Sequence, residues 1–188
     1  MAAHGDCLKL VNHNVRCLMR DARKANKVAI ATGGGSGHLP TFLGYVGYGL
    51  ADGVTVGNVF ASPSAACMYE VDKAIDNGSG VLHVYGRYGG DMINFGMVAE
   101  LVALDGIEVE EVLVTDDVAS APRGEEHKRR GVAGLFYAYK VAGAAAEKMY
   151  SLKEVKAIIQ RAVNQMRSMG GFNTVYCSRS GKSNLHHR

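Results

Sequence analysis

Short apolar runs alternate along the chain with longer segments in which apolar residues recur at helical spacing. The runs are rich in β-branched residues and are bounded by glycine, which is typical of buried strands. The expected strands are Val28 to Ala31, Val81 to Tyr85, Val109 to Thr115 and, more weakly, Gly53 to Val59. The expected helices begin at Ser62 and near Asp91, and two more cover Val132 to Glu147 and Leu152 to Met169.

Two local signals indicate where helices begin. Ser62 followed by Pro63 has the residue types preferred at the N-cap and at the first helical position. Ser151 and Glu154 have the spacing of a capping box, in which the two residues satisfy backbone N–H groups at the helix start. Both signals strengthen the prediction of a helix directly after them.

Strands that alternate with helices predict an α/β fold, a mostly parallel sheet with helices on both faces. We expect an N-terminal segment over residues 1–26, an α/β domain over 27–170, and the start of a further domain or a tail over 171–188. Ligands of such sheets bind outside the carboxyl ends of the strands. Three loops lie at those ends: Gly33 to Pro40, Gly86 to Asp91 and Thr115 to Arg123.

Composition narrows the class of protein. The 188 residues are 47% hydrophobic, enough for one domain with its own core. A formal net charge of +3 does not favour nucleic-acid binding, and the mixed charge run Arg123 to Arg130 is typical of a solvated loop, with a phosphate or partner contact as the alternative. No apolar run approaches the roughly 20 residues of a membrane helix, and the amino terminus lacks a signal-peptide pattern.

The cysteines indicate a reducing compartment. Cys7, Cys17, Cys67 and Cys177 lie far apart and do not have the spacing of a zinc site. We therefore expect free thiols in a cytoplasmic protein, and the sequence predicts no metal site.

The loop GGGSGHLP, residues 33–40, is the strongest local signal for a ligand. Glycines allow backbone N–H groups to approach a ligand closely and to form a binding nest. The loop is not a dinucleotide fingerprint, because His38 stands where the last glycine is required, and no Lys-Ser or Lys-Thr follows as in a P-loop. A purely structural turn between strand and helix explains the glycines equally well.

His38 and Asp91 are the candidate catalytic residues. His38 ends the glycine loop, and an imidazole that titrates near neutrality suits the removal of a proton from a hydroxyl. Asp91 follows two glycines at a predicted helix start. The alternatives are a surface or satisfied core histidine and an N-cap aspartate, and Asp116 and Asp117 are expected to form a turn or a cap.

Five ordered segments resemble the substrate-binding subunit of dihydroxyacetone kinases. They are KVAIATGGGSGHLP, GNVFASPSA, YGRYGGDMINFGMVAE, VTDDVASAP and KRRGVAGLFYAYKVAGAAAE, and the resemblance runs from about Lys27 to Gly170. It implies the α/β fold of that family's K domain and the function of a glycerone kinase-like phosphotransferase that holds a short hydroxy-ketone while one of its hydroxyls is phosphorylated.

The resemblance also assigns residues. It implies that Gly35, Ser36, Gly37 and His38 surround the substrate, and that His38 acts with Asp91 as acid/base and orienting groups at the reacting hydroxyl. In the family, a second histidine in a downstream G-I-H-G-E block binds the ketone covalently. This sequence ends before such a block, so we expect it to be part of a longer protein and to bind the ketone weakly by itself.

The resemblance implies a partner as well. No cofactor is expected in this chain. The phosphoryl donor, which is either ATP with Mg²⁺ or a phosphoprotein, is expected on a partner, a nucleotide-binding helical domain or subunit. The substrate-binding part is expected to be a homodimer. Two other functions stay open. One is a non-catalytic ligand sensor of the same family that acts through a regulatory partner, and the other is an ordinary nucleotide-binding domain, against which the absence of both phosphate-loop patterns counts.

The sequence departs from the common family pattern near the predicted site. Leu39 stands where a glutamate often follows the loop histidine, and Gly86 and Arg87 replace a Lys-Asn pair whose lysine contacts the substrate. Loss of that lysine is expected to leave room for one more carbon, and Arg87 offers a differently shaped cation from a neighbouring position. We therefore predict that a keto-tetrose is used at least as well as dihydroxyacetone.

Overall fold

The computed structural model describes residues 5–171, 176–177 and 183–184 and has a six-stranded sheet in the order β1-β2-β4-β3-β5-β6. Its strands are β1 (Leu8–Leu10), β2 (Cys17–Arg20), β3 (Ala29–Gly34), β4 (Gly53–Val56), β5 (Val81–Gly86) and β6 (Val109–Val114). The α-helices are α1 (Ala65–Ile75), α2 (Gly89–Leu104), α3 (Gly134–Glu147) and α4 (Leu152–Gln165). One-turn 3₁₀ helices cover Val11–His13, Ser36–His38, Leu43–Tyr45 and Glu126–Lys128, and β7 (Tyr176–Cys177) pairs with β8 (Ser183–Asn184).

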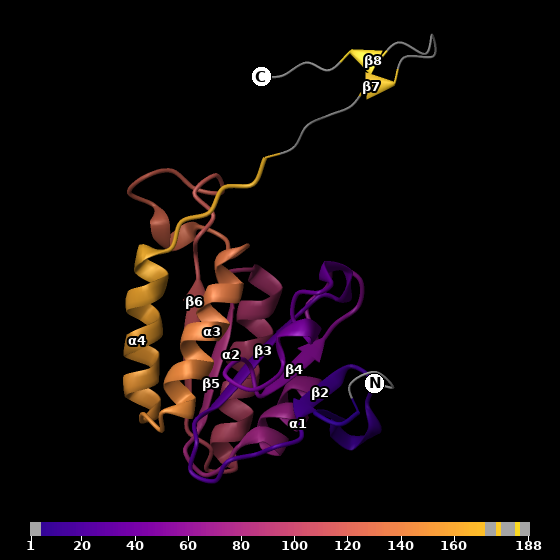
Figure 1. Ribbon diagram of the computed structural model, residues 1–188, viewed down its shortest axis with the longest axis vertical. Coiled ribbons are helices and arrows are strands. Elements are labelled where there is room, and N and C mark those ends of the chain that lie inside the picture. The colour runs from indigo at the N-terminus through magenta and orange to yellow at the C-terminus, as the bar shows by residue number, and fades with distance from the viewer. Residues whose placement is uncertain (1–4, 172–175, 178–182, 185–188) are drawn as a thin grey trace.

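The predicted fold class is confirmed. Strand β3 pairs in parallel with β4 and β5, and β5 pairs in parallel with β6. Helices α3 and α4 cover one face of the sheet, and α1 and α2 cover the other (Figure 1). No helix in the described residues is both long and apolar enough to cross a membrane.

Two strands that the sequence did not predict extend the sheet. β1 and β2 lie within residues 1–26 and form an antiparallel hairpin, and β2 pairs antiparallel with β4. Each is only three or four residues long, so neither shows a readable period, and their extended conformation depends on the neighbouring strand. Of the predicted tail 171–188, all but residues 171, 176–177 and 183–184 lies outside the described residues.

Alternate residues of the central strands supply the two halves of the core. The side that packs against α3 and α4 buries Ile30, Leu82, Val84, Val112 and Val114. The opposite side buries Ala29, Ala31 and Val81 against α1, and Tyr85 against Phe95 of α2. This alternation is the period-two pattern of strands that are covered on both faces.

Several predicted element boundaries move in the structure. The Ser62–Pro63 start of α1 is wrong: the N-cap is Ser64, whose hydroxyl accepts a hydrogen bond from the Cys67 N–H at 3.4 Å. The side chain of Asn94 instead holds the preceding segment, because it donates to the Pro63 carbonyl at 2.8 Å.

The other helix boundaries shift by a few residues. Helix α2 already begins at Gly89, α3 begins at Gly134 rather than at Val132, and α4 ends at Gln165 rather than at Met169. The capping box of Ser151 and Glu154 is confirmed.

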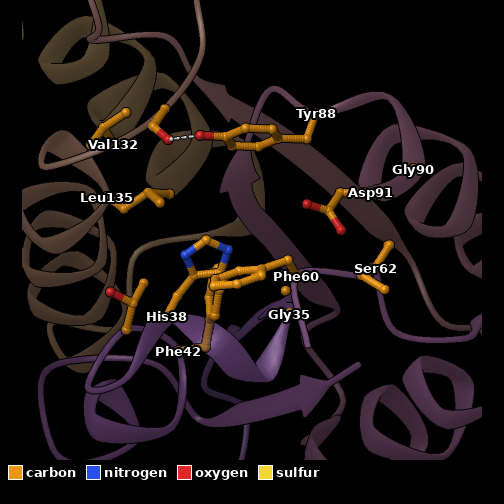
Figure 2. Close-up of a pocket in the computed structure, with 14 residues that line it drawn as sticks. Gly35, His38, Phe42, Phe60, Ser62, Tyr88, Gly90, Asp91, Val132 and Leu135 are labelled. Atoms are coloured by element: carbon orange, nitrogen blue, oxygen red, sulfur yellow. Dashed lines mark hydrogen bonds between the residues drawn. The ribbon is translucent and has the colours of Figure 1, made fainter. Parts of the chain in front are cut away.

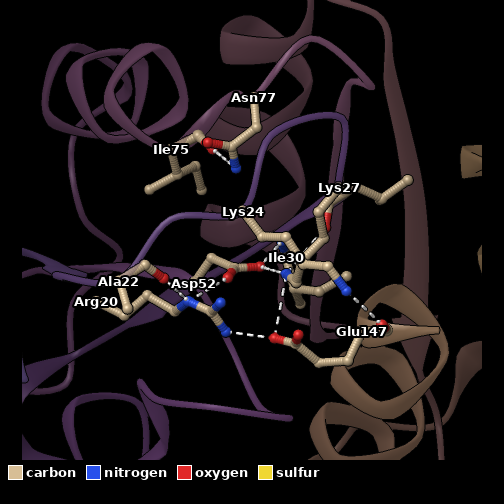
Figure 3. Close-up of polar contacts among 10 residues, drawn as sticks. Arg20, Ala22, Lys24, Lys27, Ile30, Asp52, Ile75, Asn77 and Glu147 are labelled. Atoms are coloured by element: carbon tan, nitrogen blue, oxygen red, sulfur yellow. Dashed lines mark hydrogen bonds and ion pairs between the residues drawn. The ribbon is translucent and has the colours of Figure 1, made fainter. Parts of the chain in front are cut away.

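A buried ion cluster joins the start of the parallel strands to the end of α3. Lys27 has a fully buried side chain, and its ammonium lies 2.6 Å from a carboxylate oxygen of Asp52. The guanidinium of Arg20 lies 3.2 Å from the other oxygen of Asp52 and also pairs with Glu147 (Figure 3). The Ile30 N–H donates to Asp52 at 2.9 Å, so a single carboxylate binds groups of β2, β3 and the segment before β3.

Replacement of Lys27 by Met is expected to destabilise the protein by about 3–5 kcal/mol, because loss of one partner leaves the buried Asp52 with too few cations. The matched control is Lys128→Met, which breaks a pair with Glu125 in which both side chains are about half exposed and is expected to cost about 0–1 kcal/mol. Urea unfolding of both variants measures the difference. Equal losses in the two variants would contradict a structural role for the buried pair.

Candidate functional site

A pocket of about 310 Å³ lies at the carboxyl edge of the sheet. Its walls come from the loop after β3, the loop between β4 and α1, the first turn of α2 and the segment that leads into α3 (Figure 2). The first two predicted loops therefore contribute to one site. The third predicted loop, Thr115 to Arg123, does not line the pocket, and residues 131–135 take its place.

Asp91 projects into this pocket from α2. It is the third residue of the helix, since the N-cap position belongs to Tyr88, so the N-cap alternative for Asp91 is wrong. The side chain is buried, and its Oδ1 atom has no hydrogen-bond partner among the described residues. Burial raises the pKa of Asp91 above its ordinary value, while hydrogen bonding from Ser62 and the charge of His38 act in the opposite direction.

His38 faces the same pocket from the other side. It ends the 3₁₀ turn Ser36–His38 and is exposed. No described residue forms a hydrogen bond with its imidazole; its neighbours are the rings of Phe42 and Phe60, whose centroids lie 6.0 and 5.0 Å away. Residues 53 positions apart in sequence thus share one cavity, as the sequence predicts, whereas their chemical roles stay predictions.

The glycine loop contributes less to the pocket than the resemblance implies. Gly35 lines the cavity, but Ser36 and Gly37 do not. The Ser36 N–H donates to the carbonyl of Asn58 at 3.1 Å, and the Phe60 ring covers Gly37. Substrate contacts of Ser36 and Gly37 therefore stay predictions without support from the geometry of the pocket.

Ser62 and Asn94 were not identified as site residues from the sequence. Ser62 lines the pocket beside Asp91 (Figure 2), and the Asn94 amide donates to the Ser62 hydroxyl at 3.3 Å. The sequence did contain a signal for Asn94: it follows Asp91 by three residues and therefore lies on the same side of α2. Ser62 was missed because a Ser-Pro pair has an equally plausible role as a helix start.

Tyr88 lines the pocket and occupies the space beside Gly86, the position at which the resemblance implies a lysine. A Cβ atom on Gly86 would lie 2.8 Å from the Tyr88 ring and 3.2 Å from the Gly131 carbonyl oxygen. The predicted free space beside Gly86 is therefore wrong, because Tyr88 and Gly131 occupy it. The Tyr88 hydroxyl donates to Gly131 at 2.9 Å and ties the α2 side of the pocket to the α3 side.

Asp116 fixes the segment that leads into α3. Its fully buried carboxylate accepts hydrogen bonds from the N–H groups of Val132 at 3.0 Å and Gly134 at 2.8 Å, and from the Ser168 hydroxyl. The predicted cap role of Asp116 fits this geometry, although the helix that it caps lies far along the chain. Val132, one of the residues held in this way, lines the pocket.

The fold and the pocket together define a class of protein: an α/β ligand-binding domain whose cavity combines an imidazole with a buried, partly unpaired carboxylate. The family model "Dak1 domain" matches residues 1–186, so the chain belongs to the Dak1 domain family. The family resemblance seen in the sequence is confirmed.

Named relatives support this assignment. The chain is 46% identical over 171 residues to an L-erythrulose kinase of Pectobacterium atrosepticum and covers 28% of that protein. It is 45% identical to the dihydroxyacetone-binding subunit DhaK of the PTS-dependent dihydroxyacetone kinase 2 of Listeria innocua and covers 51% of it. Both matches include 90% of this chain, so the chain spans about half or less of the length of these relatives.

A solved structure agrees with the fold. The native form of the dihydroxyacetone kinase of C. freundii matches with a TM-score of 0.81 and 31% sequence identity. The match covers 96% of this chain and 34% of that protein. The order of elements, and with it the carboxyl edge that carries the pocket, is thus shared with a kinase.

Replacement of Asp91 by Asn is expected to raise the melting temperature at pH 7. Since burial raises the pKa of Asp91 above its ordinary value, the folded chain binds the proton more tightly than the unfolded chain. Stability therefore falls as the pH rises through the interval between the two pKa values, and the uncharged Asn escapes that loss. The gain should vanish near pH 3, where Asp91 is protonated in both states.

Asp105→Asn is the control with the opposite sign. Hydrogen bonds from Tyr69 and Lys73 lower the pKa of the exposed Asp105, so its charge is favourable above the unfolded pKa and the variant should lose a little stability at pH 7. Thermal unfolding at pH 3 and pH 7 measures both variants. A lower melting temperature for Asp91→Asn at pH 7 would show that the Asp91 charge is well compensated in the folded state.

Proposed function

We propose that the protein to which this chain belongs phosphorylates a hydroxyl of a short hydroxy-ketone and that this chain forms the substrate pocket. The observation that carries the proposal is the meeting of His38 and Asp91 in one cavity of about 310 Å³. Such a cavity suits a triose or tetrose. The names of both relatives, an erythrulose kinase and a dihydroxyacetone-binding subunit, support the same class of substrate.

The two side chains divide the work at the reacting hydroxyl. The unpartnered Oδ1 of Asp91 accepts a hydrogen bond from the substrate and orients it. The His38 imidazole takes the hydroxyl proton while the oxygen attacks phosphorus and the bond between phosphorus and the donor breaks. Phosphoryl transfer depends mainly on position and on charge stabilisation, which a preformed pocket provides.

The phosphoryl donor is proposed to bind to a partner domain or subunit. Neither the dinucleotide nor the P-loop pattern occurs in the glycine loop. The Listeria relative is named as one subunit of a PTS-dependent kinase, which supports a division between substrate holder and donor carrier. A homodimer, implied by the resemblance, and a cytoplasmic location, indicated by the cysteine pattern, belong to the same proposal.

Replacement of His38 by Gln in the full-length protein is expected to lower kcat/KM about 100-fold or more, because general acid–base catalysis contributes about 10²–10⁴. A coupled kinase assay with the donor partner measures the loss. The control is His13→Gln, on the 3₁₀ helix Val11–His13 outside the pocket, which should retain the activity. If the wild-type protein binds the ketone but never phosphorylates it, the ligand-sensor alternative is the better reading.

Substrate length is tested with the same assay. We expect erythrulose to be used at least as well as dihydroxyacetone. The argument from free space at Gly86 no longer supports this prediction, and the erythrulose kinase among the relatives now does. Values of kcat/KM for the two ketoses decide it, and a preference of tenfold for dihydroxyacetone, about 1.4 kcal/mol of transition-state binding, would contradict it.

A further inference from the structure

Two phenylalanines beside His38 have a backbone conformation that bulky residues rarely adopt. The φ angle is +70° at Phe42 and +54° at Phe60, and both values are positive. Their rings meet the His38 imidazole in edge-type contacts, with interplanar angles of 87° and 67°. Strained backbone of this kind persists only where the surrounding structure imposes it, and it concentrates at functional sites.

The glycine loop makes room for these rings. A Cβ atom on Gly34 would lie 2.1 Å from the Phe42 ring, and one on Gly37 would lie 2.4 Å from the Phe60 ring. At Gly35, a Cβ would lie 2.7 Å from the Cα of Phe60. Any side chain at these positions would displace the two phenylalanines from His38.

Packing explains the conformation of Phe42 but not that of Phe60. Phe42 is only 7% exposed and belongs to the main core, whereas Phe60 is 70% exposed. Most of the apolar surface of Phe60 thus stays in contact with solvent, and burial offsets little of the strain. Met149 also has a positive φ, but it directly follows α3 and its C-cap Lys148, where helices often end in this conformation.

The His38 side chain depends on these rings for its orientation. No described residue donates a hydrogen bond to its imidazole or accepts one from it, so its orientation depends on packing, and the rings of Phe42 and Phe60 are in contact with it. Phe42 bounds the imidazole from the core side, and Phe60 lies against it at the pocket (Figure 2). Edge contacts between aromatic rings have preferred geometries, so the two contacts favour one rotamer of the imidazole.

We propose that Phe60 is a positioning residue, whose ring over Gly37 keeps the His38 imidazole turned toward Asp91 and the substrate. The proposal rests on the proposed function, since it assigns the ring to the proton transfer at that site. It also explains why an exposed phenylalanine is kept on a strained backbone against two glycines.

Phe60→Gly tests this role, because glycine accepts a positive φ without strain. The melting temperature of the full-length protein should stay the same or rise. In the assay with the donor partner, kcat should fall about tenfold or more, as expected for lost alignment of a catalytic group, with a smaller change in KM.

Two control variants show whether the effect of Phe60→Gly comes from loss of the aromatic ring. Phe60→Tyr keeps an aromatic ring and should retain the wild-type kcat. Val59→Ala alters the neighbouring residue, which is 68% exposed and does not line the pocket, and it should leave both kcat and the melting temperature unchanged.

The orientation of the His38 imidazole can be measured without any enzymatic turnover. In full-length protein with ¹³C-labelled histidine, the His38 signal, assigned by its loss in His38→Gln, should show a single ring orientation in the wild type and averaging in Phe60→Gly. Two results would overturn the proposal: a kcat within twofold of wild type with an unchanged His38 signal, or a parallel loss of melting temperature and activity in Phe60→Gly. If the wild type lacks kinase activity, the proposed function fails, whereas the NMR comparison still decides the role of Phe60.

Discussion

The buried carboxylate of Asp52 is the interaction on which the arrangement of the strands depends. It binds Lys27 and Arg20 and accepts the Ile30 N–H, so it fixes β2 and β3 relative to the start of β4. With this register, Gly34 lies opposite Val56, and the chain continues in contact, since the Gly57 N–H donates to the Gly34 carbonyl at 2.9 Å. The two loops that follow are therefore neighbours, and they form two of the four walls of the pocket.

The two buried carboxylates at the carboxyl edge of the sheet, Asp91 and Asp116, differ in how many hydrogen bonds they accept. Asp91 has an oxygen without a hydrogen-bond partner among the described residues and a raised pKa. Asp116, which follows β6 at the same edge of the sheet, uses its carboxylate to accept three hydrogen bonds. The first residue is available to a ligand, and the second has a structural role. The number of hydrogen-bond partners thus decides which of the two buried carboxylates can bind a ligand.

Glycines at this edge of the sheet leave room for aromatic side chains from other segments. Gly34 and Gly37 admit the rings of Phe42 and Phe60, and Gly86 admits Tyr88. Each glycine thus leaves space that an aromatic side chain from another segment occupies. The Tyr88 hydroxyl donates a hydrogen bond to the Gly131 carbonyl, so its ring fills the space beside Gly86 that the loss of a lysine was expected to open.

The sequence by itself determined the fold class, the central strands, the Ser151 capping box and the placement of His38 and Asp91 at one edge of the sheet, because strand and helix periods and an ordered set of motifs are local signals. Only the tertiary structure decided what the local signals leave open. β1 and β2 form because they pair with each other and β2 pairs with β4. Ser62 lies beside Asp91 because the side chain of Asn94 holds its segment. Phe60 contacts His38 because the register of β3 and β4 brings their two loops together. Such contacts join residues far apart in the chain, and no local pattern encodes the distance between them.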